Sequence, residues 1–446
     1  MNIFTSSSGC LSPEQLTVFS GRIAAYFQRR GIRYAAVVCG KSPLVYAAVQ
    51  ACRLAGVCFI PVDEALPEQR RNRILNDADE IFYDGSAFTG ESGWTDLRVI
   101  SEQRGAPTIP PEYPDAPVYR IYTSGTTGDP KCIEVTWRNL RSFMTWFRGI
   151  PAIAETNPRS VLNQANFSFD LSVADMWYSL LTEARLTVLE RSVISDLPEM
   201  FRIMKQSDAE LAVFTPSFAE LCLCDSAFCR ELMPRLRVIF FCGEILKPMT
   251  AAKLFRRFPK IRIINAYGPT EACCSVSAAE ISVEMTEAPE LPIGDIRRTA
   301  GTIHIVNGEI VITGDSVARC TNMPGGFGEY NGKRCFYTDD GGEIRDGMLW
   351  FCGRLDQQLK IKGYRVEPAD IENNLLRIPG VTRAAVSASH GRLSAQVVTD
   401  GISADEIRRR LSELVPHYMI PGKITLMESL PLTLNGKKEC HNADND

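Results

Sequence analysis

A ten-residue string at 122–131, YTSGTTGDPK, has the composition of a phosphate-binding loop. Its two glycines let backbone N–H groups approach an anion closely, and its hydroxyl groups and the Lys131 ammonium supply further donors. A Walker A loop needs Gly directly before its lysine and Ser or Thr directly after it, whereas here Pro130 precedes Lys131 and Cys132 follows it. A P-loop kinase is therefore disfavoured, and a plain polar turn is the simpler alternative. The candidate phosphate ligands are Thr123, Ser124, Gly125, Thr126, Thr127, Gly128 and Lys131.

Other segments that carry reactive side chains are spread in order along the chain. They are 166–172 (NFSFDLS), 265–271 (NAYGPTE), 337–340 (YTDD), 353–367 (GRLDQQLKIKGYRVE) and 435–437 (NGK). Each charged residue taken alone is most simply a solvated surface group. The ordered series resembles the signature motifs of the adenylate-forming superfamily, which includes acyl-CoA synthetases, luciferases and the adenylation domains of nonribosomal peptide synthesis. The resemblance spans nearly the whole chain.

Enzymes of that superfamily join a carboxylate to ATP, release pyrophosphate and pass the acyl group of the acyl-AMP to a thiol. The resemblance implies that the ring of Tyr267 packs on adenine, that Asp340 accepts both ribose hydroxyls and that Glu271 holds Mg²⁺ through a carboxylate oxygen. ATP and Mg²⁺ are therefore the expected cofactors. The ATP-binding residues implied outside the loop are Gly243, Glu244, Asn265, Tyr267, Gly268, Thr270, Asp340 and Arg354.

Lys437 is the catalytic residue that the resemblance implies for the first half-reaction. Its ammonium would bridge the attacking carboxylate and the α-phosphate, where negative charge develops in the transition state. Asp356 occupies the position of the family hinge, about which a small C-terminal domain rotates between adenylate formation and thioester formation. The simpler interpretation of the stretch that follows, 357–365, is a basic linker.

Asp170 indicates which kind of acid is activated. In the amino-acid-activating branch of the superfamily an Asp at this position pairs with the substrate's α-ammonium, and a buried carboxylate needs such a partner. The alternative is a helix N-cap, because Asp170 directly precedes a helix predicted over 171–181. The segments SFDLSV, TPSFAE and FFCGE resemble the D-alanine–carrier protein ligases in particular. The substrate-pocket residues implied are Asp170, Leu171, Ala174, Ser217, Phe240, Cys242, Ala266, Cys274 and Ser275.

Most of these pocket residues are small or apolar, so we expect a neutral amino acid of small to medium size as substrate. Ala174 stands where those ligases usually carry Met, and Ala266 where they usually carry Thr. Both differences enlarge the pocket, and filling the added space is worth roughly 0.8 kcal/mol per buried methylene. The sequence ends soon after Lys437 without a Ser-centred carrier motif, so the expected partner is a separate phosphopantetheinylated carrier protein.

Two other functions stay open. An acyl- or aryl-CoA ligase on the same fold would not need the Asp170 carboxylate. A catalytically inactive nucleotide-binding homologue would not need Lys131, Glu271, Asp340 and Lys437, all of which are present.

Alternating strands and helices must position these residues. Ser12 and Pro13 begin a helix, a buried strand is predicted over 34–39, and a second helix runs from Ser42 to Gly56 before a strand over 57–62. Further short strands are predicted over 118–122, 185–189, 211–214, 238–242 and 262–265, with a hairpin over 301–313. The predicted class is α/β. A large N-terminal domain of stacked βαβ sheets with a β-rich subdomain covers 1–355, and a small mobile α+β domain covers 356–446.

Composition excludes several classes of protein. The 446 residues include 49 Lys and Arg against 53 Asp and Glu, and this net charge of -4 disfavours a dedicated nucleic-acid binder. No apolar run approaches the ~20 residues of a membrane span, and the N-terminus does not resemble a secretion signal. The 15 cysteines form no CxxC pairs and the four histidines lack metal-ligand spacing. We therefore expect a reduced, cytoplasmic protein without a zinc site, and a monomer.

Overall fold

The computed structural model describes residues 2–86, 89–110, 113–125, 130–322, 325–356, 358–361, 364–389 and 392–429. The chain divides into two compact units. The first comprises Met1–Glu64, Asp77–Ile121 and Cys132–Leu355, and the second comprises Ala65–Asn76, Tyr122–Lys131 and Asp356–Asp446. The sequence-based division into 1–355 and 356–446 assigns Ala65–Asn76 and Tyr122–Lys131 to the N-terminal domain, whereas these two segments belong to the second unit. The predicted domain boundary itself stays a prediction.

One sheet of the mixed α/β fold has eight strands. Every neighbouring pair from β13 to β1 is parallel, while both edge strands run antiparallel to their neighbours. The strands, in sheet order, are β14 (Ser277–Ile281), β13 (Arg262–Tyr267), β12 (Val238–Phe241), β11 (Leu211–Phe214), β9 (Ser160–Asn163), β10 (Arg185–Val188), β1 (Phe4–Ser6) and β2 (Gly9–Leu11). Parallel strands buried on both faces have continuous apolar runs, and such runs predicted β10, β11, β12 and β13 but not β1 and β9.

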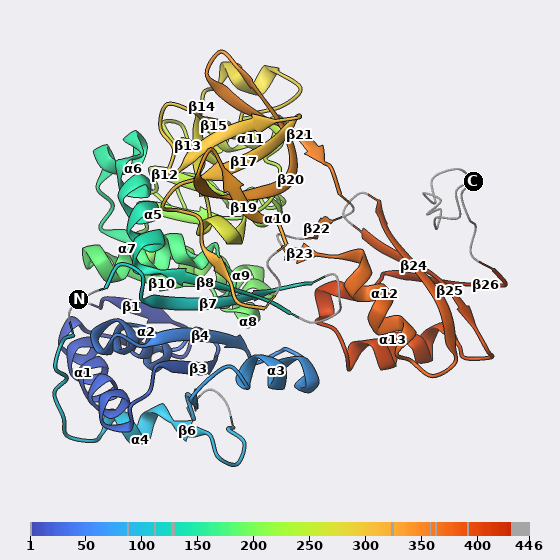
Figure 1. Ribbon diagram of the computed structural model, residues 1–446. Helices are drawn as coiled ribbons and strands as arrows, with labels where there is room; N and C mark the ends of the chain where they lie inside the picture. The colour runs from blue at the N-terminus through green and yellow to red at the C-terminus, as the bar shows by residue number, and fades with distance from the viewer. Residues whose placement is uncertain are drawn as a thin grey trace. The chain divides into compact units, whose positions relative to one another are not determined.

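A second sheet has seven strands and contains the predicted βαβ unit, since β3 and β4 pair in parallel. Its strands, in sheet order, are β18 (Arg319–Cys320), β8 (Lys131–Thr136), β7 (Pro117–Thr123), β4 (Cys58–Asp63), β3 (Tyr34–Cys39), β5 (Glu80–Tyr83) and β6 (Thr95–Asp96). In Figure 1, helices α1 (Pro13–Arg30) and α2 (Pro43–Ala55) lie side by side next to this sheet. The predicted helix start at Ser12 is confirmed as a capping box with Gln15.

The first unit contains further helices, several of which connect parallel strands. They are α4 (Leu97–Ser101), α5 (Trp137–Gly149), α6 (Pro151–Thr156), α7 (Ser172–Thr182), α8 (Arg191–Ile194), α9 (Leu197–Ser207), α10 (Pro216–Leu223), α11 (Pro248–Arg257) and the 3₁₀ turns η1 (Thr270–Ala272) and η2 (Glu284–Glu287). Large buried apolar clusters fill the space between these helices and the sheets.

The β-rich subdomain expected from the sequence is an antiparallel sheet of six strands. The predicted hairpin is confirmed, and its turn residues Asn307 and Gly308 have φ angles of 53° and 83°, as a type I′ turn requires. The strands are β15 (Gly294–Asp295), β21 (Met348–Arg354), β20 (Lys333–Arg345), β17 (Glu309–Thr313), β16 (Thr302–Val306) and β19 (Phe327–Tyr330).

The second unit has its own apolar core and a three-stranded sheet. Helix α12 packs on strand β24 and helix α13 on strand β26 (Figure 1). A buried ion pair of 2.9 Å between Arg70 Nη2 and Asp370 Oδ2 joins the inserted helix α3 to α12. The elements are α3 (Glu68–Leu75), β22 (Leu359–Ile361), β23 (Tyr364–Val366), α12 (Pro368–Leu376), β24 (Val381–Ser389), β25 (Arg392–Thr399), α13 (Ala404–Ser412), η3 (His417–Met419) and β26 (Lys423–Met427).

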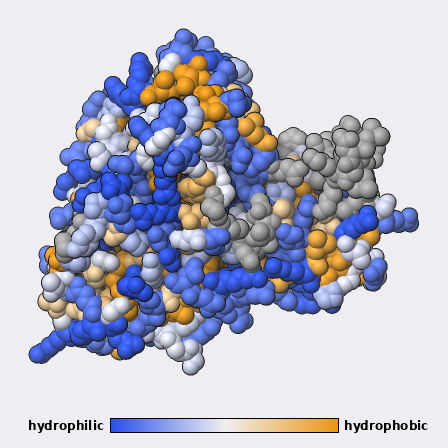
Figure 2. Space-filling view, in the orientation of Figure 1, coloured by the Kyte–Doolittle hydropathy of each residue, from blue (hydrophilic) through white to orange (hydrophobic). Residues whose placement is uncertain are grey.

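Hydrophilic residues predominate on the face of the molecule that Figure 2 shows. Within the part of the chain that the structure describes, no helix is both long enough and apolar enough to cross a membrane.

Candidate active site

A tight chain reversal follows β13 and forms the centre of the candidate site. Val276 N donates to Tyr267 O at 2.8 Å, so the chain returns directly alongside the end of the strand. A Cβ on Gly268 would lie 2.4 Å from Ser275 Cα, so only glycine fits at this position. Cys273 and Cys274 adopt left-handed φ angles of 60° and 75°, which L residues rarely occupy. The reversal thus brings the residues after the YGPTE motif to the C-terminal end of a parallel sheet.

A buried carboxylate joins this reversal to the β-rich subdomain. Tyr267 donates its hydroxyl to Asp340 Oδ2 at 2.6 Å, and Arg354 Nη1 lies 2.7 Å from Asp340 Oδ1. Asp340 is only 3% exposed and pairs with Arg354 across β20 and β21. Burial, followed by the Asp340 charge, raises the pKa of the Tyr267 phenol. The structure therefore brings three of the sequence-predicted nucleotide residues into one hydrogen-bonded group.

Asp170 does not cap helix α7, so the N-cap alternative is wrong. The helix begins at Ser172, its N-cap is Leu171, and no side chain makes a capping hydrogen bond there. The Asp170 carboxylate instead accepts a hydrogen bond from Thr270 Oγ1, which lies in the chain reversal. Thr270 thus orients the Asp170 carboxylate, a group whose charge can attract a cation.

Most of the predicted pocket residues belong to one buried apolar cluster. Cys242 Sγ lies 3.8 Å from Cys274 O. The hydrogen bond with Cys242 and burial raise the pKa of Cys274, and the Asp170 charge adds to the effect. The predicted residues in the cluster are Leu171, Ala174, Phe240, Cys242, Ala266 and Cys274.

Two further residues of this region were missed by the sequence analysis. Tyr119, on β7, makes a contact of 3.3 Å between its hydroxyl and Cys273 Sγ, and both residues are buried. Burial raises the pKa of Cys273, and the nearby Asp170 charge contributes. The Cys-Cys pair one residue beyond the YGPTE motif was the available signal for Cys273, whereas the contact of Tyr119 depends on the sheet order.

The predicted polar residues at the ends of β12 and β13 are largely engaged within the chain. Glu244 Oε2 accepts from Ser217 N at 2.8 Å, which links the chain after Gly243 to the start of α10. The buried Asn265 donates its amide to Pro292 O at 2.9 Å. Ser275 Oγ is buried and has no hydrogen-bond partner among the residues that the structure describes. The expected roles of these residues toward adenine and substrate stay predictions.

Glu271 is fully buried in the turn η1, and its backbone oxygen accepts from Ala318 N at 2.8 Å. A carboxylate offers the hard oxygen that Mg²⁺ prefers, so the donor chemistry fits the expected metal. Among the described residues, no group of three or more His, Cys, Asp or Glu could hold a metal ion. A metal held by Glu271 would thus take its other ligands from phosphate oxygens and water, as Mg²⁺ usually does.

The phosphate loop is described only at its ends. Ser124 Oγ donates to Arg365 O at 2.9 Å, and Lys131 opens strand β8. Asp356, the predicted hinge, accepts a hydrogen bond from Gln358 N at 3.0 Å. The predicted phosphate ligands Thr126, Thr127 and Gly128 and the predicted catalytic residue Lys437 lie outside the described residues.

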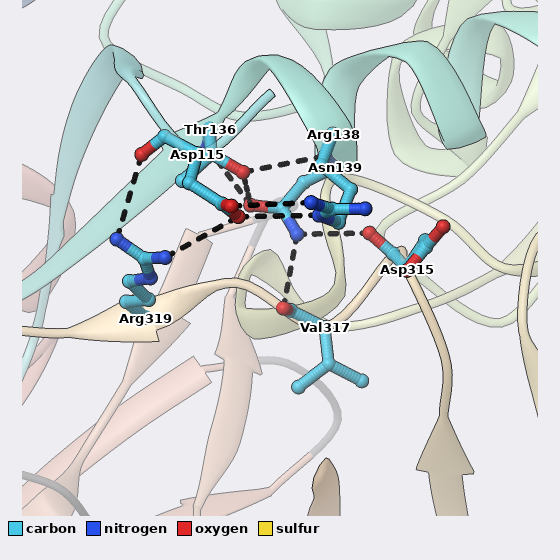
Figure 3. A network of polar contacts seen from close by, with 7 residues as sticks. All are labelled: Asp115, Thr136, Arg138, Asn139, Asp315, Val317 and Arg319. Carbon is cyan, nitrogen blue, oxygen red and sulfur yellow. Dashed lines mark hydrogen bonds and ion pairs between the residues drawn. The ribbon is translucent and has the colours of Figure 1, made fainter. Parts of the chain in front are cut away.

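The strand that leaves the phosphate loop is fixed by a polar network that the sequence did not indicate (Figure 3). Asn139, near the start of α5, donates to Asp315 O at 2.8 Å and Val317 O at 3.0 Å. Asp115 makes ion pairs with both Arg138 and Arg319. The segment that ends in β18 is thereby held next to β8, with which it pairs.

Comparisons with known proteins define the class to which this fold and site belong. Residues 11–320 match the family described as AMP-binding enzyme, and residues 370–437 match the AMP-binding enzyme C-terminal domain. The chain therefore belongs to the AMP-binding enzyme family, whose ligases use ATP.

Two curated relatives are similar to this chain over most of their length. A D-alanine–D-alanyl carrier protein ligase of Listeria monocytogenes serotype 4a (strain HCC23) is 34% identical over 438 residues, which cover 89% of this chain and 85% of that protein. The ligase of the same name from Bacillus cereus (strain AH187) is 35% identical over 433 residues, covering 86% and 84%.

Solved structures share the fold at lower sequence identity. The o-succinylbenzoate CoA synthetase of Bacillus subtilis has a TM-score of 0.82 at 20% identity, covering 98% of this chain and 94% of that one. An adenylation domain of Vibrio cholerae, solved with glycyl-adenosine-5'-phosphate, has a TM-score of 0.81 at 20% identity, covering 96% and 92%.

Proposed function

We propose that this chain is an ATP-dependent ligase that activates a neutral amino acid as aminoacyl-AMP. It then transfers the aminoacyl group to the phosphopantetheine thiol of a separate carrier protein. Membership of the AMP-binding enzyme family and the resemblance to curated carrier protein ligases over most of the chain support this proposal. The ligase names also favour D-alanine as the first candidate substrate.

The environment of the Asp170 carboxylate is the observation that favours an amino acid over a simple carboxylic acid as the substrate. Its carboxylate makes no helix cap and is oriented by Thr270 beside the buried residues Cys273 and Cys274. Asp170 is half-buried, and its carboxylate would form an ion pair with a substrate ammonium. The acid substrate of an acyl- or aryl-CoA ligase has no ammonium group to make this pair.

The chain's own residues have distinct parts in this reaction. Tyr267 presents its ring to adenine, while its hydroxyl and Arg354 hold the Asp340 carboxylate for the ribose hydroxyls. Glu271 would hold Mg²⁺, which supplies charge neutralisation for the phosphates when it is bound. The Lys437 ammonium would stabilise the negative charge that develops on the carboxylate and the α-phosphate. A cytoplasmic monomer stays our expectation.

Amino-acid-dependent exchange of labelled pyrophosphate into ATP tests this function directly. The panel consists of the twenty common amino acids, D-alanine and other D enantiomers, with acetate, propionate and benzoate as simple acids. We expect exchange with one or a few neutral amino acids and none with the simple acids. Exchange with a simple acid alone would favour the acyl- or aryl-CoA ligase, whereas ATP binding without any exchange would favour the inactive homologue.

The second half-reaction needs its own measurement. Intact-mass analysis of a phosphopantetheinylated carrier protein, incubated with enzyme, ATP and the amino acid found in the panel, should show the added aminoacyl mass. Loading of coenzyme A but of no carrier protein would contradict the proposed acceptor.

A further inference from the structure

Lys41 is a buried lysine that has no role in the reaction proposed above. It lies between the end of β3 and Ser42, the N-cap of α2, and it is 4% exposed. Burial lowers the pKa of its ammonium to about 7. A cation directly before a helix N-terminus is also disfavoured by the helix dipole. A lysine in such an environment requires specific partners.

Two backbone carbonyl groups are those partners. Lys41 Nζ donates to Gln164 O and to Leu189 O, both at 2.7 Å. Gln164 is the first residue after β9, and Leu189 is the first residue after the neighbouring strand β10. The ammonium therefore links the ends of two adjacent parallel strands.

Gln164 also begins the segment 164–170, which we call the substrate loop because it ends at Asp170. The loop has further tethers along its length. Asn166 Nδ2 donates to Asp63 Oδ2 at 3.2 Å, and Asp170 is held by Thr270. Lys41 thus fixes the start of a loop whose other end carries the proposed amine-binding carboxylate.

The surroundings of Lys41 are charged on several sides. Asp175 is fully buried, and both of its oxygens accept from Asn163 Nδ2 at 2.9 Å. Burial raises the pKa of Asp175 to about 8. The charged groups that face Lys41 are Asp175 on α7, Glu190 and Arg191 at the start of α8, and Asp63 at the end of β4.

We propose that Lys41 is a positioning residue for amino acid binding. Its ammonium fixes the start of the substrate loop, so that Asp170 presents its carboxylate to the substrate's α-ammonium in one orientation. The inference rests on the proposed function, because it takes Asp170 as the amine-binding group. Since Lys41 acts through the loop, its loss weakens amino acid binding while ATP binding persists.

Lys41→Met tests this role because methionine keeps most of the side-chain volume and removes the donor. In the exchange assay, with the amino acid that the wild type activates fastest, we expect the KM for the amino acid to rise roughly tenfold. The KM for ATP should stay within about twofold. As pH rises from 6 to 8, the wild-type KM for the amino acid should increase because Lys41 loses its proton, and this increase should be absent in the variant.

Two further variants keep the test decisive. Ser207→Ala removes a buried hydroxyl donor at the end of α9, outside the candidate site, so it should lower Tm without changing the ratio of the two KM values. If Lys41→Met alone does not fold, the double variant Lys41→Met, Asp175→Leu takes its place. The double variant leaves no unpaired buried carboxylate, so it should fold and show the same selective rise in the KM for the amino acid.

The outcomes separate this inference from the function on which it rests. A wild type that activates an amino acid, with Lys41 variants whose two KM values change equally or not at all, would overturn the positioning role alone. A wild type that activates no amino acid would overturn the proposed function and the positioning role together.

Discussion

The hydroxyl of Tyr267 and its ring have separable roles at the residue scale. The hydroxyl donates to Asp340, whereas the ring is the proposed adenine platform. In Tyr267→Phe the ring is kept and the carboxylate loses one donor, so we expect the KM for ATP to rise about fivefold. Pyrophosphate exchange at varied ATP measures this, and the KM for the amino acid serves as the internal control. A variant that loses both affinities equally would contradict the separation of roles.

Gly268 is the residue at which the chain reversal depends most on the absence of a side chain. In Gly268→Ala the new Cβ would overlap the Ser275 backbone, so we expect a loss of about 3 kcal/mol in the free energy of unfolding. Thermal unfolding followed by circular dichroism measures the change. Gly149→Ala is the matched control, since no described atom outside its chain neighbours and its own helix backbone lies within 4 Å of the added carbon. Equal Tm values for the two variants would refute the steric argument.

At the element scale, the buried pair of Lys41 and Asp175 makes stability depend on pH. The folded pKa of Asp175 is raised to about 8, so its contribution to stability falls as pH rises from about 4 to 8. In the folded chain the pKa of Lys41 is lowered to about 7. Between about pH 7 and 10.5 the folded chain has therefore lost a proton that the unfolded chain still holds. The contribution of Lys41 therefore rises with pH in that window, and the pair destabilises the fold most near pH 7–8.

The double variant Lys41→Met, Asp175→Leu should remove this minimum. Relative to the wild type, its Tm should gain most at pH 7.5 and less at pH 5 and pH 9.5, as thermal unfolding in one buffer series would show. A gain that is the same at all three pH values would mean that the pair does not titrate in this range.

The elements with continuous apolar runs could be predicted from sequence, and those with local polar signals could be predicted even to their ends. The strand at Leu211–Phe214 and the helix cap at Ser12 are examples. The motifs also predicted one site for Tyr267, Asp340 and Arg354, and the structure joins these residues by hydrogen bonds, whereas their contact with a nucleotide stays a prediction. The partners of Lys41 and the contact of Tyr119 with Cys273 could not be found, because they depend on which strands become neighbours. No local pattern encodes that order.

At the scale of the whole molecule, the second unit depends on a segment far away in sequence. Arg70 is 8% exposed and pairs with the fully buried Asp370, which also accepts from Asn374 Nδ2 at 2.9 Å. Arg70→Met would leave that carboxylate without its cation, so we expect a loss of about 3–5 kcal/mol in the stability of this unit. Hydrogen exchange of the amides in α12 would measure it. Arg409→Met, at an exposed ion pair, should leave the exchange nearly unchanged.

The central claim is that the Asp170 carboxylate selects an amino acid by pairing with its α-ammonium. The most direct measurement compares alanine, in the enantiomer that the wild type activates faster, with propionate in pyrophosphate exchange by wild type and Asp170→Ala. We expect the wild type to prefer alanine and Asp170→Ala to lose roughly a hundredfold in kcat/KM for alanine, with little change for propionate. Undiminished alanine activation by Asp170→Ala, or equal wild-type activation of propionate, would contradict the account.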